Sequence, residues 1–200
     1  MNKRYDNKKL FLILTGLLAI LLLTVVIKIP KQRSTLKENL VEFDTASVVR
    51  IVIKPKTVDG NEFEFIREKA GWKVKQNDII TTPRKNAVSN IFTEILDIKP
   101  QSLAAVSSSE WKNYELTDSL ATRIKFLDKK GKILADIMIG KFSYRQVAAN
   151  PYSPRQNNFA GTSYVRLTDE DRIYSVDGFL SLSFGGGFND WRDKTLLRCS

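Results

Sequence analysis

The sequence predicts an α+β protein: a single N-terminal transmembrane helix, then antiparallel sheet units (β-β-β-α followed by β-hairpins) packed on one or two helices. Three observations predict this class. Leu10–Ile27 is free of charge, several short segments after residue 47 alternate polar and apolar residues, and one segment near residue 90 repeats apolar residues at helical spacing. The chain therefore divides into a membrane segment and a sheet-forming domain.

The uncharged run is long enough to cross a bilayer. At about 1.5 Å per residue, a helix over 10–29 would span about 30 Å, the thickness of the hydrocarbon core. Lys28 lies near its end, where a long side chain can reach the interface. The run is longer than the apolar region of a cleaved signal peptide and no small-residue cleavage site follows, so we expect a retained signal anchor; a cleaved signal is the alternative.

Charge leaves the orientation of this anchor open, because four cations precede the run and four follow it. The layout favours one direction. Residues 1–9 form a short basic tail that we expect in the cytoplasm, 30–44 a tether, and 45–197 an extracytoplasmic domain, of one unit or of two subdomains (45–100 and 101–197). This arrangement predicts a single-pass protein of the bacterial inner membrane with most of its chain on the periplasmic side.

Composition argues against several classes of function. The net charge of +10 is concentrated near the anchor: residues 1–37 hold eight Lys and Arg and one Asp, which leaves 24 basic and 21 acidic residues, a net +3, for the rest. Nucleic-acid binding is therefore not expected. There is no histidine and one cysteine, Cys199, so His-based catalysis, a zinc site or a disulfide is not expected, nor is any cofactor.

The first part of the domain reads as β-β-β-α over 46–99. Residues 48–53, 62–67 and 72–75 are β-branched or alternating, with turn residues between them. Thr82 is a candidate N-cap with Pro83 in the first helical position, and Pro100 ends the predicted helix. Its apolar stripe includes Ile91, which we expect in one core with Trp72.

The second part reads as a strand over 102–106, a helix start at Ser107, and two hairpins, 122–128 with 132–139 and 162–167 with 172–176. Residues 179–184 fit a short helix, and Trp191 a core position. Leu196 and Leu197 read as the start of a further strand, so we expect the functional unit to extend past Ser200.

Residues 141–161 read as a long loop, a length that in compact domains is usually functional or disordered. Its aromatic, arginine and amide side chains are typical of protein interfaces, and an ordinary mobile insertion is the alternative. The candidate partner-binding residues are Tyr144, Arg145, Tyr152, Arg155, Asn157, Asn158 and Phe159.

Two other motifs favour structural interpretations. Asp169-Glu170-Asp171 could form an acid/base or cation site but fits a solvated turn better. Gly185-Gly186-Gly187 lacks the spacing of a phosphate-binding loop, so a flexible loop or tight turn is favoured.

Over about 44–197 the sequence resembles the bacterial domain-of-unknown-function-4340 family. The resemblance rests on the order of short motifs after the anchor: 49–53, 71–74, 114–116, 122–126, 138–140, 164–166, 173–176 and 191–194. One departure is Glu115, where the family pattern commonly has glycine. Relatives generally continue into a second αβ half, and the family has no established catalytic residues.

The resemblance implies an envelope protein anchored in the inner membrane, of a kind often encoded beside the permease and ATPase of gliding-type ABC transporters. We therefore expect a non-enzymatic accessory or interaction subunit of an ABC-type transport or gliding-related complex, with a transporter permease as the partner. Two alternatives are a ligand-binding envelope ectodomain, for a glycan or small molecule, and a carboxylate-dependent hydrolase.

Overall fold

The computed structural model describes residues 11, 13–17, 36, 38–56, 61–146 and 159–195. The chain separates into two units, Met1–Leu36 and Lys37–Ser200. In the first unit, residues 11 and 13–17 are helical and expose Phe11, Ile13, Leu14 and Leu17. No helix within the described residues is long and apolar enough to span a membrane. Most of the predicted anchor over 10–29 lies outside the described residues.

The second unit is built on one nine-stranded sheet in the order β4-β3-β2-β1-β6-β7-β8-β9-β5. All its strand pairs are antiparallel. The strands are β1 Val48–Lys54, β2 Phe63–Glu68, β3 Gly71–Gln76, β4 Ile79–Thr81, β5 Pro100–Ala105, β6 Thr122–Asp128, β7 Ile133–Gln146, β8 Phe159–Leu167 and β9 Ile173–Asp177. The described fold is thus mostly antiparallel sheet with few short helices.

Separate sheet units were wrong as an expectation, because the β-β-β-α segment and the hairpins share this sheet. β1 pairs with β6, and β5 crosses to the far edge and pairs with β9. The burial of β1 explains why the two segments share one sheet. Ile51, Val52 and Ile53 are all buried, so β1 lies inside the sheet with both of its faces covered. The β-β-β-α segment also has a fourth short strand, β4, between β3 and the helix.

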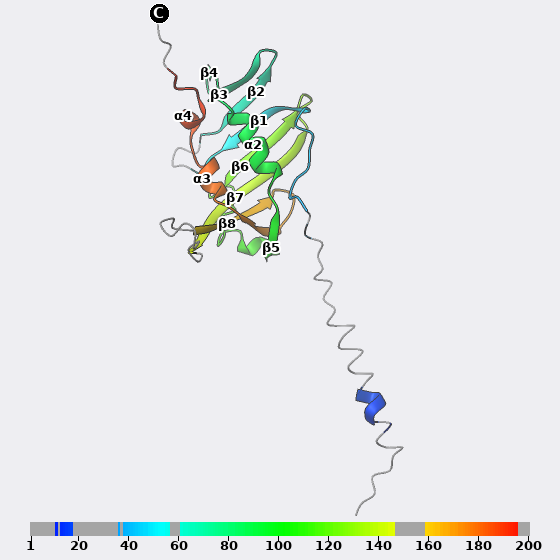
Figure 1. Ribbon diagram of the computed structural model, residues 1–200. Helices are drawn as coiled ribbons and strands as arrows, with labels where there is room; N and C mark the ends of the chain where they lie inside the picture. Colours follow the sequence, from blue (N-terminus) through cyan, green and yellow to red (C-terminus); the bar gives the residue numbers. More distant parts are fainter. Residues whose placement is uncertain are drawn as a thin grey trace, which may run out of the picture. The chain divides into compact units, whose positions relative to one another are not determined.

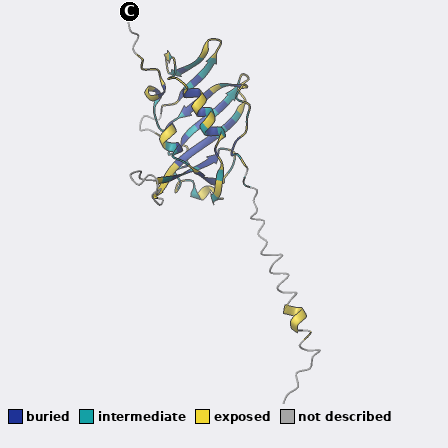
Figure 2. Ribbon diagram, in the orientation of Figure 1, coloured by how far each residue is buried: buried dark blue, intermediate teal, exposed yellow. Residues whose placement is uncertain are grey.

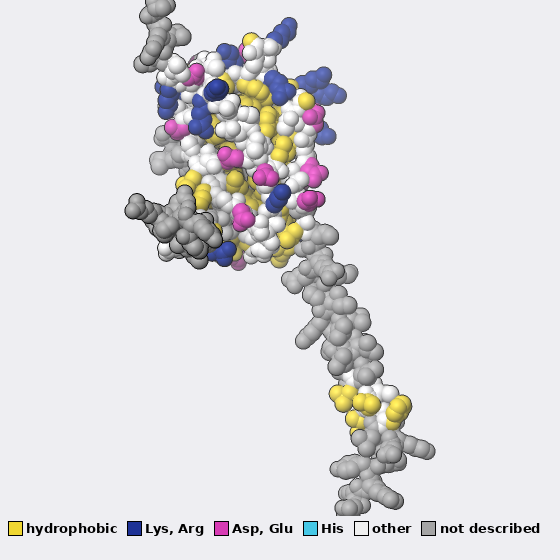
Figure 3. Space-filling view, viewed as in Figure 1, with side chains coloured by type: hydrophobic (Ala, Val, Ile, Leu, Met, Phe, Trp, Pro, Cys, Tyr) yellow, Lys and Arg dark blue, Asp and Glu magenta, His cyan; other side chains and the backbone are white. Residues whose placement is uncertain are grey.

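Three short helices cover one face of the sheet: α2 Ala87–Leu96, α3 Leu180–Phe184 and α4 Phe188–Trp191. Figure 1 shows α2 lying across the strands, and Figure 2 shows burial concentrated where the helices meet the sheet. In the space-filling view of this face, hydrophobic side chains remain visible between charged ones (Figure 3). The helices therefore cover the sheet only in part.

The predicted helix begins later than expected. Pro83 forms a β-bridge with Arg192, and Arg84 N donates to Trp191 O, so the segment before α2 pairs with the end of the described chain. The helix starts after Asn86, which has a left-handed φ of 61°. Its predicted apolar stripe is confirmed, since Ala87, Val88, Ile91 and Ile95 are buried.

The core between sheet and helices is aromatic. Trp191 is buried and contacts Phe63, Phe65 and Phe184, with ring centroids 5.7–6.4 Å apart. Trp72 is only half-buried, contrary to expectation, because it sits at the rim of this core between Phe92 and the Arg67 guanidinium. The strand position that points fully inward is Val74.

A second, smaller core lies on the opposite face of β7. Successive strand residues point to opposite faces, and Met138 is as buried as its neighbours Ile137 and Ile139. Met138 packs with Leu116, Ala121 and Ile173. The segment between β5 and β6, which begins with the predicted helical turn after Ser107 (η1, Ser108–Glu110), provides the cover for this face.

Candidate functional site

The two ends of the predicted interface loop belong to a β-hairpin. β7 and β8 stay paired up to Gln146 opposite Phe159, so strand structure replaces the expected loop over 141–146 and 159–161, and 147–158 lie outside the described residues. The signal was present, because Phe142 and Tyr144 alternate with polar residues at period two. Pro151 and Pro154, which follow, favoured a loop and outweighed this alternation in the prediction.

This hairpin brings three of the predicted interface residues together. Tyr144 is 68% exposed and Phe159 49%, and their rings make an edge-to-face contact with centroids 5.8 Å apart. Arg145 is exposed beside them. We call Phe142, Tyr144, Arg145 and Phe159 the hairpin tip. The other predicted residues, Tyr152, Arg155, Asn157 and Asn158, lie outside the described residues.

The base of the hairpin tip is held by the loop that leads into α3. The Phe179 ring lies over Gly161, where a Cβ would come within 2.6 Å of it, and also packs against Phe142 with centroids 5.5 Å apart. Ser163 Oγ donates to Gly178 O at 2.8 Å and accepts from Leu180 N at 2.9 Å. The tip is therefore presented from a fixed base.

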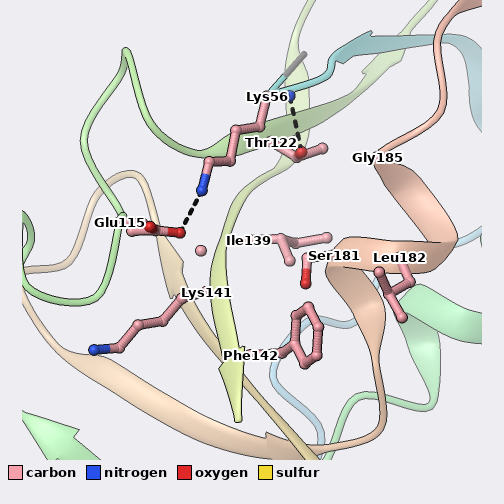
Figure 4. Close-up of a pocket in the computed structure, with 10 residues that line it drawn as sticks. Lys56, Glu115, Thr122, Ile139, Lys141, Phe142, Ser181, Leu182 and Gly185 are labelled. Atoms are coloured by element: carbon pink, nitrogen blue, oxygen red, sulfur yellow. Dashed lines mark hydrogen bonds and ion pairs between the residues drawn. The ribbon is translucent and has the colours of Figure 1, made fainter.

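A pocket of about 480 Å³ opens beside Phe142, between β7, α3 and the segment that precedes β6. Figure 4 shows Lys56 and Glu115 directed toward each other at one end, with Ile139, Phe142 and Leu182 along the wall. No local sequence motif predicts this pocket, because its residues are spread from 56 to 185 and meet only in the folded chain.

The polar groups of the pocket are one ion pair and two hydroxyls, those of Thr122 and Ser181. Lys56 Nζ donates to Glu115 Oε2, with both side chains partly exposed. The Oγ of Ser181, on α3, is shielded from solvent and has no hydrogen-bond partner among the described residues. Lys141 also lines the pocket, but its Nζ lies over the Tyr114 and Tyr164 rings, and Figure 4 shows it pointing away from the cavity.

Backbone packing places Glu115 at this pocket. A Cβ on Gly140 would lie 2.1 Å from Tyr114 O, so glycine is required for the turn to approach β7. Lys141 N then donates to Tyr114 O at 3.0 Å, which fastens the turn to the strand. Glu115 follows with φ of 58°, in the left-handed region. Glycine adopts that conformation without strain, whereas a residue with a Cβ does not.

Arg166 is the most buried cation among the described residues and supports the same segment from the other face of the sheet. It is 3% exposed and donates to the carbonyl oxygens of Leu116, Leu167 and Thr168. Its guanidinium stacks on Trp111 at 3.7 Å, and burial lowers its pKa. These contacts are to backbone and to an aromatic ring, which indicates a structural role.

The remaining sequence motifs have structural roles where they are described. Residues 168–169 form the turn between β8 and β9, where Glu170 N donates to Leu167 O and Glu170 accepts from the Tyr174 hydroxyl. Gly185–Gly187 joins α3 to α4. No cluster of three or more His, Cys, Asp or Glu suited to a metal ion occurs among the described residues.

Residues 80–200 match the family described as "Domain of unknown function (DUF4340)", which is more than half of the chain. The chain belongs to the DUF4340 family. The resemblance seen in the sequence is thereby supported from residue 80 onward, and β1–β3 precede the matched range. No curated protein and no solved structure gave a match.

Proposed function

We propose that this DUF4340 chain is a membrane-anchored, non-enzymatic accessory subunit that binds a membrane-protein partner through its hairpin tip on the periplasmic side of the inner membrane. The partner we propose is the permease of an ABC-type transport or gliding-related complex. The anchor rests on the uncharged run Leu10–Ile27, and the choice of partner on the gene context implied by the family resemblance.

The exposed aromatic residues of the hairpin tip carry this proposal. Aromatic and arginine side chains are enriched at protein interfaces and supply most of the binding energy there. Tyr144 and Phe159 expose 68% and 49% of their surface while contacting one another, and Arg145 adds a cation beside them. Holding such rings in a fixed hairpin lowers the entropy lost on binding.

Two other functions remain as alternatives. The pocket beside Phe142 favours a ligand-binding ectodomain, since about 480 Å³ falls in the range of small-molecule sites. A carboxylate-dependent hydrolase needs two carboxylates across a cleft. Within the described residues that line this pocket, Glu115 is the one carboxylate, so the hydrolase has less support.

The experiment is a comparison of co-purifying membrane proteins. The tagged full-length chain is expressed in its native host, recovered from solubilised membranes, and its partners are identified by mass spectrometry. We expect a transporter permease with the unmodified chain, and its loss with Tyr144→Ser combined with Phe159→Ser, because the double change removes both exposed rings.

The matched control is Ile79→Ser combined with Ile80→Ser. These residues, 60% and 57% exposed, lie on β4 at one edge of the sheet, away from β7 and β8. The control should retain the permease at the level of the unmodified chain. Equal recovery of the permease with both double variants would exclude the hairpin tip as the docking surface, and a pull-down without any transporter component would remove the proposed partner.

A further inference from the structure

We propose that the pocket between β7, α3 and Glu115 is a binding site for a small zwitterion with an apolar body, the class of apolar amino acids and their short peptides. The proposal does not require a partner at the hairpin tip, although Phe142 belongs to both the tip and the pocket. It rests on three properties of the pocket: its paired charges, an apolar wall and a strained residue at the mouth.

The charges at the pocket match a zwitterion. Lys56 and Glu115 present one positive and one negative group side by side, and both remain partly exposed, at 42% and 35%. The charge of Lys141 is turned away onto the two tyrosine rings. The pocket is thus neutral overall, so a ligand with a single charge would leave one charge of the pocket unmatched. A carboxylate can bind Lys56 while an ammonium group binds Glu115.

The rest of the pocket suits an apolar side chain. Ile139 is buried at the base of the wall, while Phe142 and Leu182 remain 36% and 65% exposed at its rim. Small-molecule sites commonly combine such walls with a few polar groups that fix orientation. An aliphatic or aromatic side chain lying between these residues would be removed from water together with the two rim residues.

The strained backbone of Glu115 directs its carboxylate toward Lys56. A non-glycine residue with φ of 58° is sparsely populated, and such strain occurs most often at ligand clamps and functional sites. Here it is fixed by the contact of Gly140 with Tyr114. The carboxylate therefore faces Lys56 through a backbone conformation that glycine would adopt without strain.

The test is isothermal titration calorimetry of the full-length chain in detergent with four probes: L-leucine, leucyl-leucine, leucinamide and N-acetyl-leucine. Leucinamide lacks the carboxylate and N-acetyl-leucine lacks the ammonium group. We expect leucine or its dipeptide to bind with a Kd below about 1 mM, and each single-charge derivative to bind at least about tenfold more weakly.

Variants locate the binding. Glu115→Gln should weaken binding of the zwitterion by about tenfold or more, because it removes the charge that binds the ammonium group. The control is Ser183→Ala, on the exposed side of α3, which should leave binding unchanged. Retention of the circular dichroism spectrum and melting temperature by each variant shows that it is folded.

Three results would overturn the proposal. One is the absence of heat from both leucine and leucyl-leucine up to about 10 mM. Another is equal affinity for the zwitterion and its single-charge derivatives, which would mean that Lys56 and Glu115 do not both contribute to binding. The third is unchanged binding by Glu115→Gln, which would place any binding elsewhere.

Discussion

Glu115 adopts a left-handed backbone conformation, with φ of 58°, in the turn that packs against Gly140. For a residue with a Cβ, this conformation costs roughly 1–2 kcal/mol. Its ion pair with Lys56 is partly exposed and contributes only about 0–1 kcal/mol. The backbone strain therefore costs more free energy than the ion pair contributes to stability. Stability alone does not explain a glutamate at this position, which is consistent with a role for its carboxylate.

The Glu115 strain can be measured by comparing two variants. Glu115→Ala and Glu115→Gly both remove the pair with Lys56, but only glycine relieves the backbone. We expect the glycine variant to be more stable than the alanine variant by about 1 kcal/mol in the free energy of unfolding by urea. Equal stability, or a more stable alanine variant, would show that the turn is not strained.

Arg166 should be the most sensitive cation of the described domain. Arg166→Met removes donors from the carbonyls of Leu116, Leu167 and Thr168 and leaves those acceptors in a buried site. We expect a loss of about 2–4 kcal/mol in the free energy of unfolding. Arg172→Met, at an exposed position just before β9, should change it by less than about 0.5 kcal/mol. Similar effects of the two would refute the structural role of Arg166.

At the scale of single elements, α2 shows how a helix face is fixed by its spacing. Ile91 is 1% exposed and lies with Ala87, Val88 and Ile95 on the buried side. Ile91→Ala should therefore cost about 2–5 kcal/mol in the free energy of unfolding, through lost burial and the cavity that remains. Asn90→Ala, one residue away on the exposed side, should cost less than about 1 kcal/mol. A loss below about 0.5 kcal/mol for Ile91→Ala would contradict the burial of this face.

The local elements were predictable where their signal was local. The hairpin of β6 and β7 is confirmed over 122–139 because polar and apolar residues alternate around Lys129–Gly131, and the Ser107 N-cap is confirmed by its contact with Ser109 N. The start of α2 was wrong because Pro83 is used for a bridge to Arg192, a partner more than a hundred residues away. The extension of β7 was missed because prolines beyond it outweighed the alternation at Phe142 and Tyr144.

At the scale of the whole molecule, strand order was beyond the reach of sequence patterns. The pairing of β1 with β6 and of β5 with β9 joins segments about seventy residues apart, and no local motif specifies such partners. The candidate site divides in the same way. Tyr144 and Phe159 could be named from composition, whereas the Lys56–Glu115–Ser181 pocket depends on the assembled sheet.

Membrane attachment belongs to this scale as well and is testable in the run Leu10–Ile27. Leu18 lies outside the described residues, so the expectation rests on the sequence alone. Leu18→Arg places a charge in mid-span at a cost of about 2.5–3.5 kcal/mol on insertion scales. We expect less of the full-length chain in the carbonate-resistant membrane fraction, whereas Leu36→Arg, beyond the run, should leave the fraction unchanged. Full retention of the Leu18 variant would show that this run is not the anchor.

Contact between the hairpin tip and a membrane-protein partner can be tested most directly by site-specific photocrosslinking. A photoreactive phenylalanine derivative replaces Tyr144 in the full-length chain, or Ile79 as an equally exposed control, and native membranes are irradiated. We expect an adduct with a transporter permease from position 144 and none from position 79. The same adduct from both positions, or no permease adduct from position 144 in a chain shown to be in the membrane, would contradict this expectation.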